Sequence, residues 1–230
     1  MYRTNNFQLG GRETGLVRLA FAQSLFEARA FSGGTPKFGA TFIIDAKDTA
    51  LLKILRSKVV ECVESEWGQK GLDFLQKGII KNPILDGAKS FSKKTGEVHN
   101  GFGPGTFFIR VQSGADRPPV IIWKDPNKRE TEATVYSGCS GKCVLNAYCW
   151  KHPQSGDGVS FGIFGFQKLA EGDRLGGGEV SGESFYEAFT DAPQETKSGA
   201  GAGALFDNAK GIEKTTAFDD LLAAKTQHAA

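Results

Sequence analysis

The period of the apolar residues constrains the fold of this chain most strongly, because it is helical in only one segment. Elsewhere, short runs rich in β-branched and aromatic residues are typical of strands. These predicted strands cover residues 15–22, 38–45, 105–112, 118–125, 142–150 and 158–170. Strands that are not separated by regular helices favour a small closed barrel over a doubly wound sheet. We therefore expect a mainly β fold.

The single helical segment follows the second predicted strand. Its apolar residues recur at helical spacing and include Leu51, Leu55, Val59 and Cys62. Asp45 can cap the beginning of this helix, and we expect the helix to end near Gly68. Residues 69–104 mix short apolar pieces with lysines and predict an elaborated connection. The first ten residues are polar, and we expect them to fray.

Charge divides the chain into a basic body and an acidic end. Residues 1–169 carry 23 Lys and Arg against 15 Asp and Glu, a net charge of +8, whereas residues 170–230 carry 5 against 11, a net charge of −6. A basic body is typical of a protein that meets a polyanion, although ordinary variation of surface charge is the alternative. We expect a folded domain over residues 1–176 and a flexible acidic tail over residues 177–230.

Four cysteines raise the question of a metal site or a disulfide framework. They are Cys62, Cys139, Cys143 and Cys149. With 40% hydrophobic residues the chain can fill a core without disulfides, and we expect free thiols in a reducing cytoplasm. In one strand Cys143 and Cys149 would lie about 20 Å apart, because a strand rises about 3.3 Å per residue. One zinc ion cannot bind both, so we expect small core residues and no metal or other cofactor.

The sequence carries no signature of an enzyme. GxxxxGK[ST] and a GxGxxG that opens a helix after a strand are both absent. The histidines at 99, 152 and 228 have no Cys/His motif around them. No apolar leader begins the chain, and no run approaches the eighteen apolar residues of a membrane span. We expect a non-enzymatic protein of the cytoplasm.

The segment from 142 to 150 sorts two kinds of side chain onto two faces. Its odd positions are small and apolar: Cys143, Leu145, Ala147 and Cys149. Its even positions include a cation, an amide and two large aromatics: Lys142, Asn146, Tyr148 and Trp150. Because bases stack on exposed rings while cations follow the phosphates, the even face predicts a surface for single-stranded nucleic acid. An aromatic face covered by the rest of the fold is the alternative.

The segment from 158 to 170 alternates in a similar way. We assign its odd positions, among them Val159, Phe161 and Ile163, to the core. We assign its even positions to the ligand, which adds Phe164, Phe166 and Lys168 to the candidate binding residues. Further cationic or aromatic candidates lie on or beside the other predicted strands and are Arg18, Lys37, Arg110, Trp123 and Lys124.

Four motifs occur in a fixed order along roughly residues 14 to 180. They are KFGATFII at 37–44, EWG at 66–68, YSGC at 136–139 and the GV…G…QK…G..LGGG block at 158–178. In this order the chain resembles the OB-fold single-stranded DNA-binding proteins of tailed bacteriophages. The resemblance implies a five-stranded Greek-key OB-fold barrel with one main helix after the second strand, an elaborated connection and a flexible C-terminal tail.

The same resemblance implies a function. It implies sequence-nonspecific binding and protection of single-stranded DNA in phage replication, recombination and repair, in the cytoplasm of an infected host cell. Four residues match the family's pattern individually: Lys142, Asn146, Tyr148 and Trp150. The tail would contact a replicative DNA polymerase or helicase, and a homodimer stays open.

Three other functions compete with this hypothesis. A phage single-strand annealing recombinase would also bind single strands, but it should pair complementary ones. A metal-dependent nucleic-acid enzyme needs a carboxylate cluster, which the strand pattern does not show. A protein-interaction module without nucleic-acid binding is the third alternative.

Overall fold

A computed structural model describes most of the chain up to residue 175. The described residues are 1–30, 34–92, 95–125, 127–154 and 156–175. The tail expected at 177–230 lies outside them. Within these ranges, no helix is both long enough and apolar enough to cross a membrane.

One sheet dominates the described part of the chain and contains eight strands. They are β1 (Phe7–Leu9), β2 (Val17–Ala20), β3 (Lys37–Asp45), β4 (Ile84–Asp86), β5 (Thr106–Gly114), β6 (Val120–Ile122), β7 (Ser140–His152) and β8 (Gly156–Ala170). Each predicted strand corresponds to one of these, so all six are confirmed. The two short strands β1 and β4 were not predicted, because three residues are too few to show a period of two.

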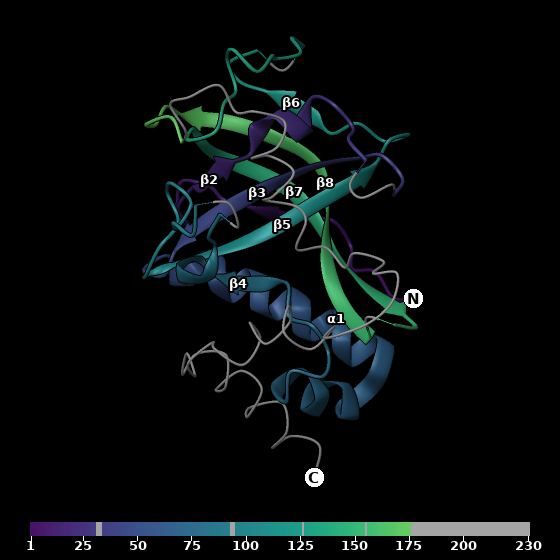
Figure 1. The fold of residues 1–230 in the computed structure, drawn as a ribbon. Helices are drawn as coiled ribbons and strands as arrows, with labels where there is room; N and C mark the ends of the chain where they lie inside the picture. The colour runs from purple at the N-terminus through teal and green to yellow at the C-terminus, as the bar shows by residue number, and fades with distance from the viewer. Residues whose placement is uncertain (31–33, 93–94, 126, 155, 176–230) are drawn as a thin grey trace.

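Five of the strands close into a barrel (Figure 1). Around the ring, β2 pairs with β3, β3 with β5, β5 with β8, β8 with β7, and β7 again with β2. In the ring, β8 therefore comes before β7, which reverses their order in the sequence, as in a Greek key. The three remaining strands extend this ring, β1 on β7, β4 on β5 and β6 on β8. A five-stranded barrel with its main helix after the second strand of the ring is confirmed.

The expectation of a frayed N-terminus is wrong. Strand β1 pairs with β7, and the Leu9 side chain is completely buried in the core. Before β1, the backbone N–H of Thr4 donates to the carbonyl of Ala147 at 2.9 Å. Pairing with a distant strand supplies the hydrogen bonds and burial that the polar N-terminal sequence does not indicate by itself.

The helix α1 (Thr49–Gln76) lies at one end of the barrel, and β6 lies at the opposite end (Figure 1). Its backbone leaves helical geometry at Gly68, where φ is 63° and ψ is −158°. Glycine adopts a positive φ without the steric cost that a Cβ imposes. The helix resumes after this kink because Leu72 and Leu75 are buried. The predicted end is therefore a kink, and the helix continues for two more turns.

A bulge in β8 changes which side chains enter the core. Val144 pairs with Gly165, but the next residue of β7, Leu145, pairs with Ile163. Phe164 is therefore the extra residue on β8 at this step. Before the bulge, buried positions are odd-numbered, as in Phe161 and Ile163. After it they are even-numbered, and the ring of Phe166 stacks on that of Phe42 with centroids 5.6 Å apart.

Candidate nucleic-acid interface

The outer face of the barrel is the sheet surface that points away from the apolar core. On β7 the predicted core residues Cys143, Leu145, Ala147 and Cys149 are all buried in that core. Their neighbours Lys142, Val144, Tyr148 and Trp150 are half-buried or exposed and lie on the outer face. The separation of the two faces of β7 is therefore confirmed, with one exception at Asn146.

Asn146 is part of the sheet surface but only 2% exposed. It pairs with Gly162 on β8, and a Cβ added to Gly162 would lie 2.4 Å from the Asn146 side-chain oxygen. The amide therefore fills the space that the glycine leaves open. The expectation that Asn146 presents its side chain to a ligand is wrong for this structure, because the neighbouring strand buries it.

A row of polar and aromatic side chains crosses the outer face from β3 to β7. Lys37 on β3 donates from Nζ to the side-chain oxygen of Gln112 on β5 at 3.3 Å. Gln112 donates from Nε2 to the hydroxyl of Tyr148 on β7. The guanidinium of Arg3 lies 5.5 Å from the centre of the Tyr148 ring. We call Lys37, Gln112, Tyr148 and Arg3 the outer-face row.

Burial favours the neutral form of the Tyr148 hydroxyl. Burial raises the pKa of its hydroxyl, and this effect outweighs the hydrogen bonds with Gln112 and Ser160, which lower the pKa. The ring is nevertheless half-buried rather than covered. Its orientation is therefore fixed by partners on two neighbouring strands, as a stacking platform requires.

Trp150 lies beside this row, at the end of β7 that leads to the β7–β8 hairpin. It pairs with Gly158, and a Cβ at Gly158 would lie only 2.4 Å from Cζ2 of the indole. The indole therefore lies against the backbone of β8 because residue 158 is glycine. The ammonium of Lys81, from the connection after α1, lies 5.5 Å from the ring centre. Burial lowers the pKa of Lys81.

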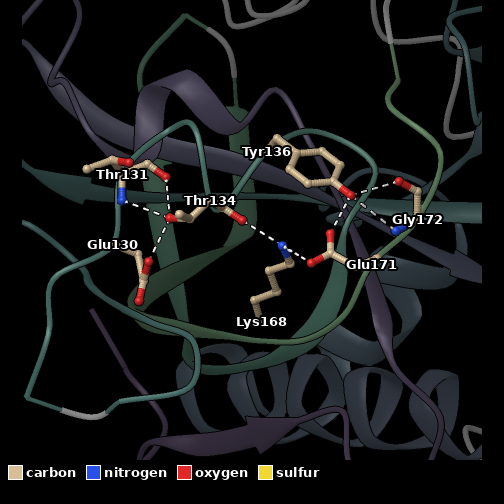
Figure 2. A network of polar contacts seen from close by, with 7 residues as sticks. All are labelled: Glu130, Thr131, Thr134, Tyr136, Lys168, Glu171 and Gly172. Atoms are coloured by element: carbon tan, nitrogen blue, oxygen red, sulfur yellow. Dashed lines mark hydrogen bonds and ion pairs between the residues drawn. The ribbon is translucent and has the colours of Figure 1, made fainter.

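Two other predicted residues of β8 are buried, so their expected place on the exposed outer face is wrong. Phe166 is 1% exposed and Lys168 is 2% exposed. The Lys168 ammonium donates to the backbone carbonyl of Thr134 at 2.6 Å and pairs with Glu171 at 2.8 Å (Figure 2). The bulge at Phe164 lies between Ile163 and these two residues. The buried positions are odd before it and even after it, so a single period of two cannot describe β8. Phe164 remains 41% exposed.

The remaining predicted cations have partners of their own. Arg18 on β2 donates from Nη2 to the carbonyl of Asp173 at 3.0 Å and from Nε to that of Gly138 at 3.3 Å. Arg110 on β5 is half-buried, with its guanidinium 5.5 Å from the Phe108 ring centre. Their side chains lie on the outer face, since the neighbours Leu19, Ile109 and Val111 enter the core.

Trp123 and Lys124 lie just after β6, at the end of the barrel opposite α1 (Figure 1). The Lys124 ammonium lies 4.4 Å from the Trp123 ring centre, and the Lys168 ammonium lies 4.1 Å from it. These two predicted residues therefore belong with Lys168 rather than with the outer-face row.

Sequence reasoning missed Arg3, Lys81 and Gln112. The first two lie in segments without strand character, and each reaches an aromatic residue of β7 from far away in the sequence. Gln112 could have been found from the pattern, because it shares the alternation of Arg110 on the predicted 105–112 strand. Local periodicity identifies faces of a strand, but it does not identify which loop lies over a face.

Cys62, Cys143 and Cys149 are buried core residues, as predicted, and Cys139, which was predicted in the turn before β7, is buried as well. All four are free, and burial raises the pKa of the Cys143 thiol well above its usual value. The Sγ atoms of Cys62 on α1 and Cys149 on β7 lie 2.8 Å apart. Among the described residues, no group of three His, Cys, Asp or Glu side chains is arranged to hold a metal ion.

Known proteins share both sequence and fold with this chain. Protein p50 of Acyrthosiphon pisum secondary endosymbiont phage 1 is 28% identical over 182 residues, which are 78% of this chain and 94% of p50. The single-stranded DNA-binding protein of bacteriophage Enc34 in complex with ssDNA superposes with a TM-score of 0.55 at 15% identity. That match covers 74% of this chain and 89% of the phage protein. A second structure of the Enc34 protein has a TM-score of 0.54 at 16% identity, covering 79% and 89%.

The structural likeness supports the fold, and a family model supports the relationship. The predicted OB-fold barrel is confirmed, because the barrel matches these single-stranded DNA-binding proteins over most of its length. The family model for the ssDNA-binding protein of Enterobacter phage Enc34 matches residues 13–196. This match covers well over half of the chain and confirms the resemblance seen in the sequence. The chain therefore belongs to the family of the Enterobacter phage Enc34 ssDNA-binding protein.

Proposed function

We propose that this chain binds single-stranded DNA on the outer face of its barrel, by base stacking and by contacts of cations with phosphates. The outer-face row carries this proposal, because Tyr148 on β7 lies between the cations Lys37 on β3 and Arg3 near the N-terminus. Family membership supports the same ligand, since the Enc34 protein is a single-stranded DNA-binding protein.

The proposed contacts divide by chemistry. Base stacking falls to Tyr148, Trp150 and Phe164, and each stacked base contributes about 1–3 kcal/mol. Phosphate contacts fall to the cations on or beside the outer face, which are Arg3, Arg18, Lys37, Lys81, Arg110 and Lys142. Because every base has a π-face and every nucleotide a phosphate, this combination binds without sequence preference.

The proposal includes a biological role. The chain protects single strands during phage DNA replication, recombination and repair, in the cytoplasm of the infected host cell, and it catalyses no reaction. The sequence match to a phage protein and the fold shared with the phage Enc34 protein support this role. The tail at 177–230 is proposed to contact a replicative polymerase or helicase, and a homodimer is a further proposal.

Titration of labelled oligonucleotides tests the function directly. We expect the full chain to bind oligo(dT) and to bind a duplex of equal length at least tenfold more weakly. The logarithm of the binding constant should fall with the logarithm of salt concentration by about 0.7 per phosphate contacted. Equal or tighter binding to the duplex would contradict the proposal. Pairing of two complementary strands by the protein would instead favour the annealing recombinase.

A further inference from the structure

The surroundings of Lys168 form a second polar cluster, separate from the outer-face row (Figure 2). The Lys168 side chain is 1% exposed, and its ammonium contacts the carbonyl of Thr134 and the carboxylate of Glu171. Glu171 also accepts a hydrogen bond of 2.6 Å from the Tyr136 hydroxyl. In contrast to the lysine, Glu171 is 59% exposed. The exposed carboxylate of Glu171 therefore covers the buried ammonium of Lys168.

Cations and rings alternate through this cluster. The Lys168 ammonium lies 4.1 Å from the ring centre of Trp123 and 4.8 Å from that of Tyr136. A second cation lies at each ring, because Lys124 is 4.4 Å from the Trp123 centre and the Arg174 guanidinium is 4.0 Å from the Tyr136 centre. Both outer cations are exposed. The cluster thus presents three cations around one carboxylate.

The donors of this cluster suit an oxygen anion in general and do not require that it be a glutamate. Donors from Lys168 and Tyr136 converge on the Glu171 carboxylate, and they lower the pKa of that group. A phosphodiester presents the same kind of acceptor, two oxygens that share one negative charge. The two exposed cations Lys124 and Arg174 leave positive charge beyond what Glu171 balances. An acidic side chain, Glu130, lies near Thr134 and accepts a hydrogen bond from its hydroxyl at 2.7 Å.

The cluster is connected to the outer face. Arg18, whose side chain lies on that face, donates to the carbonyl of Asp173 at 3.0 Å. Asp173 lies between Glu171 and Arg174 in the segment that leaves β8. The next residues of this segment are tied to the barrel as well, because the Leu175 N–H donates to the carbonyl of Ser137 at 2.9 Å. A strand that crosses the outer face at Arg18 can therefore continue to the cluster.

We infer that the cluster of Lys168, Tyr136, Lys124 and Arg174 is a subsite for a phosphodiester of single-stranded DNA, and that the carboxylate of Glu171 occupies it in the free protein. This inference rests on the proposed function. In the complex, the DNA phosphate takes the place of the Glu171 carboxylate beside the Lys168 ammonium. Glu171 is then an internal competitor, and removal of its charge strengthens binding.

The variant Glu171→Gln tests this competition, with Glu61→Gln as its matched control. Glu61 on α1 has the same kinds of partner, since it pairs with Lys58 at 2.7 Å and accepts from the Tyr2 hydroxyl at 3.3 Å. We expect E171Q to bind oligo(dT) roughly two- to fivefold more tightly than the wild type, as expected for the loss of one carboxylate that is itself exposed. We expect E61Q to bind like the wild type. Thermal unfolding of each variant checks that the fold is intact.

Two outcomes of that comparison overturn the inference. If E171Q unfolds at a lower temperature but binds oligo(dT) with wild-type affinity, Glu171 is only a structural tether. If E61Q gains as much affinity as E171Q, the gain reflects net charge alone. A wild-type chain that binds no oligonucleotide would instead contradict the proposed function itself, which keeps the two failures distinct.

A second pair of variants avoids any change near the buried lysine. The double variant Lys124→Gln/Arg174→Gln removes the two exposed cations of the cluster. We expect its log–log salt slope to be shallower by about 1.4, from about 0.7 for each lost contact. The control Lys53→Gln/Lys70→Gln removes two exposed lysines of α1 and should keep the wild-type slope. Equal slopes for the wild type and K124Q/R174Q would exclude a phosphate at this cluster.

Discussion

Gln112 on β5 donates a hydrogen bond to the hydroxyl of Tyr148 on β7, although β8 lies between these two strands in the ring. The residues on β8 under this bond are small, since Ser160 pairs with Tyr148 and Gly162 pairs with both Gln112 and Asn146. A glycine and a serine leave room for longer side chains to meet above the strand. The bond therefore depends on the sequence of three strands.

Two replacements of Tyr148 distinguish the contribution of its ring to DNA binding from that of its hydroxyl. We expect Tyr148→Ala to weaken oligo(dT) binding by about 1–3 kcal/mol, because it removes one stacking surface. Tyr148→Phe keeps the ring and should bind within about fivefold of the wild type, since one hydrogen bond contributes about 1 kcal/mol or less to holding the ring in place. Fluorescence anisotropy at constant salt measures both variants. Equal losses for Ala and Phe would show that the hydroxyl, rather than the ring, meets the DNA.

Trp150 offers a larger stacking surface next to the same row. We expect Trp150→Ala to weaken oligo(dT) binding several-fold, by about 1–3 kcal/mol, while the fold remains intact. Phe74 is a matched control, because it is an aromatic residue of α1 that is 41% exposed and lies outside the outer face. Phe74→Ala should leave the affinity unchanged. Wild-type affinity in W150A would remove this end of β7 from the binding surface.

Gly158 determines where the Trp150 indole can lie. A Cβ there would approach Cζ2 of the indole to 2.4 Å, which no real contact tolerates. We expect Gly158→Ala to move the indole, to change its fluorescence emission and to lower oligo(dT) affinity several-fold. Gly11→Ala is the control, because its Cβ would meet its nearest atom at an ordinary 3.5 Å. An unchanged emission spectrum in G158A would contradict this packing.

Phe164 and Phe166 test the bulge, because they lie two residues apart on β8 and differ in burial. Phe166 is 1% exposed and stacks on Phe42, so Phe166→Ala should cost about 3–5 kcal/mol of unfolding free energy. Phe164 is 41% exposed, and Phe164→Ala should cost less than about 1 kcal/mol while weakening oligo(dT) binding. Urea unfolding of both variants measures the difference. Similar costs would contradict the register of β7 and β8.

Glu66 predicts a pH dependence of stability. It pairs with Lys151 at 2.8 Å and accepts from the Tyr2 N–H at 2.6 Å, and these contacts hold its pKa below the usual carboxyl value. Since the folded carboxyl binds its proton less readily than the unfolded one, the gain in stability is complete above the ordinary pKa, about 4.3, and disappears as the pH falls through the lowered pKa.

Melting temperatures across this pH range check the prediction. Glu66→Gln should unfold at a lower temperature than the wild type at pH 7, and the difference should shrink toward pH 2. Glu13→Gln, at an exposed glutamate near the N-terminus, controls for a general change of charge. A difference between wild type and E66Q that stays constant with pH would show that the carboxylate charge does not matter.

The sequence alone determined the strands of the barrel, the single main helix and the core residues of β7. These features are local, because the period of the side chains decides which of them a strand or helix can bury. For the same reason Lys142, Tyr148 and Trp150 were placed correctly on the outer face. A resemblance in ordered motifs supplied the OB fold, which the family match and the solved structures confirm.

Only the tertiary structure decided what depends on register and on contacts between distant segments. At Phe164, β8 has one residue more than the facing part of β7. This bulge buries Phe166 and Lys168, which were expected on the ligand face. Gly162 buried Asn146, and two remote segments brought Arg3 to Tyr148 and Lys81 to Trp150. A period of two sorts side chains within one strand, but it contains no information about the strand or loop that lies against them.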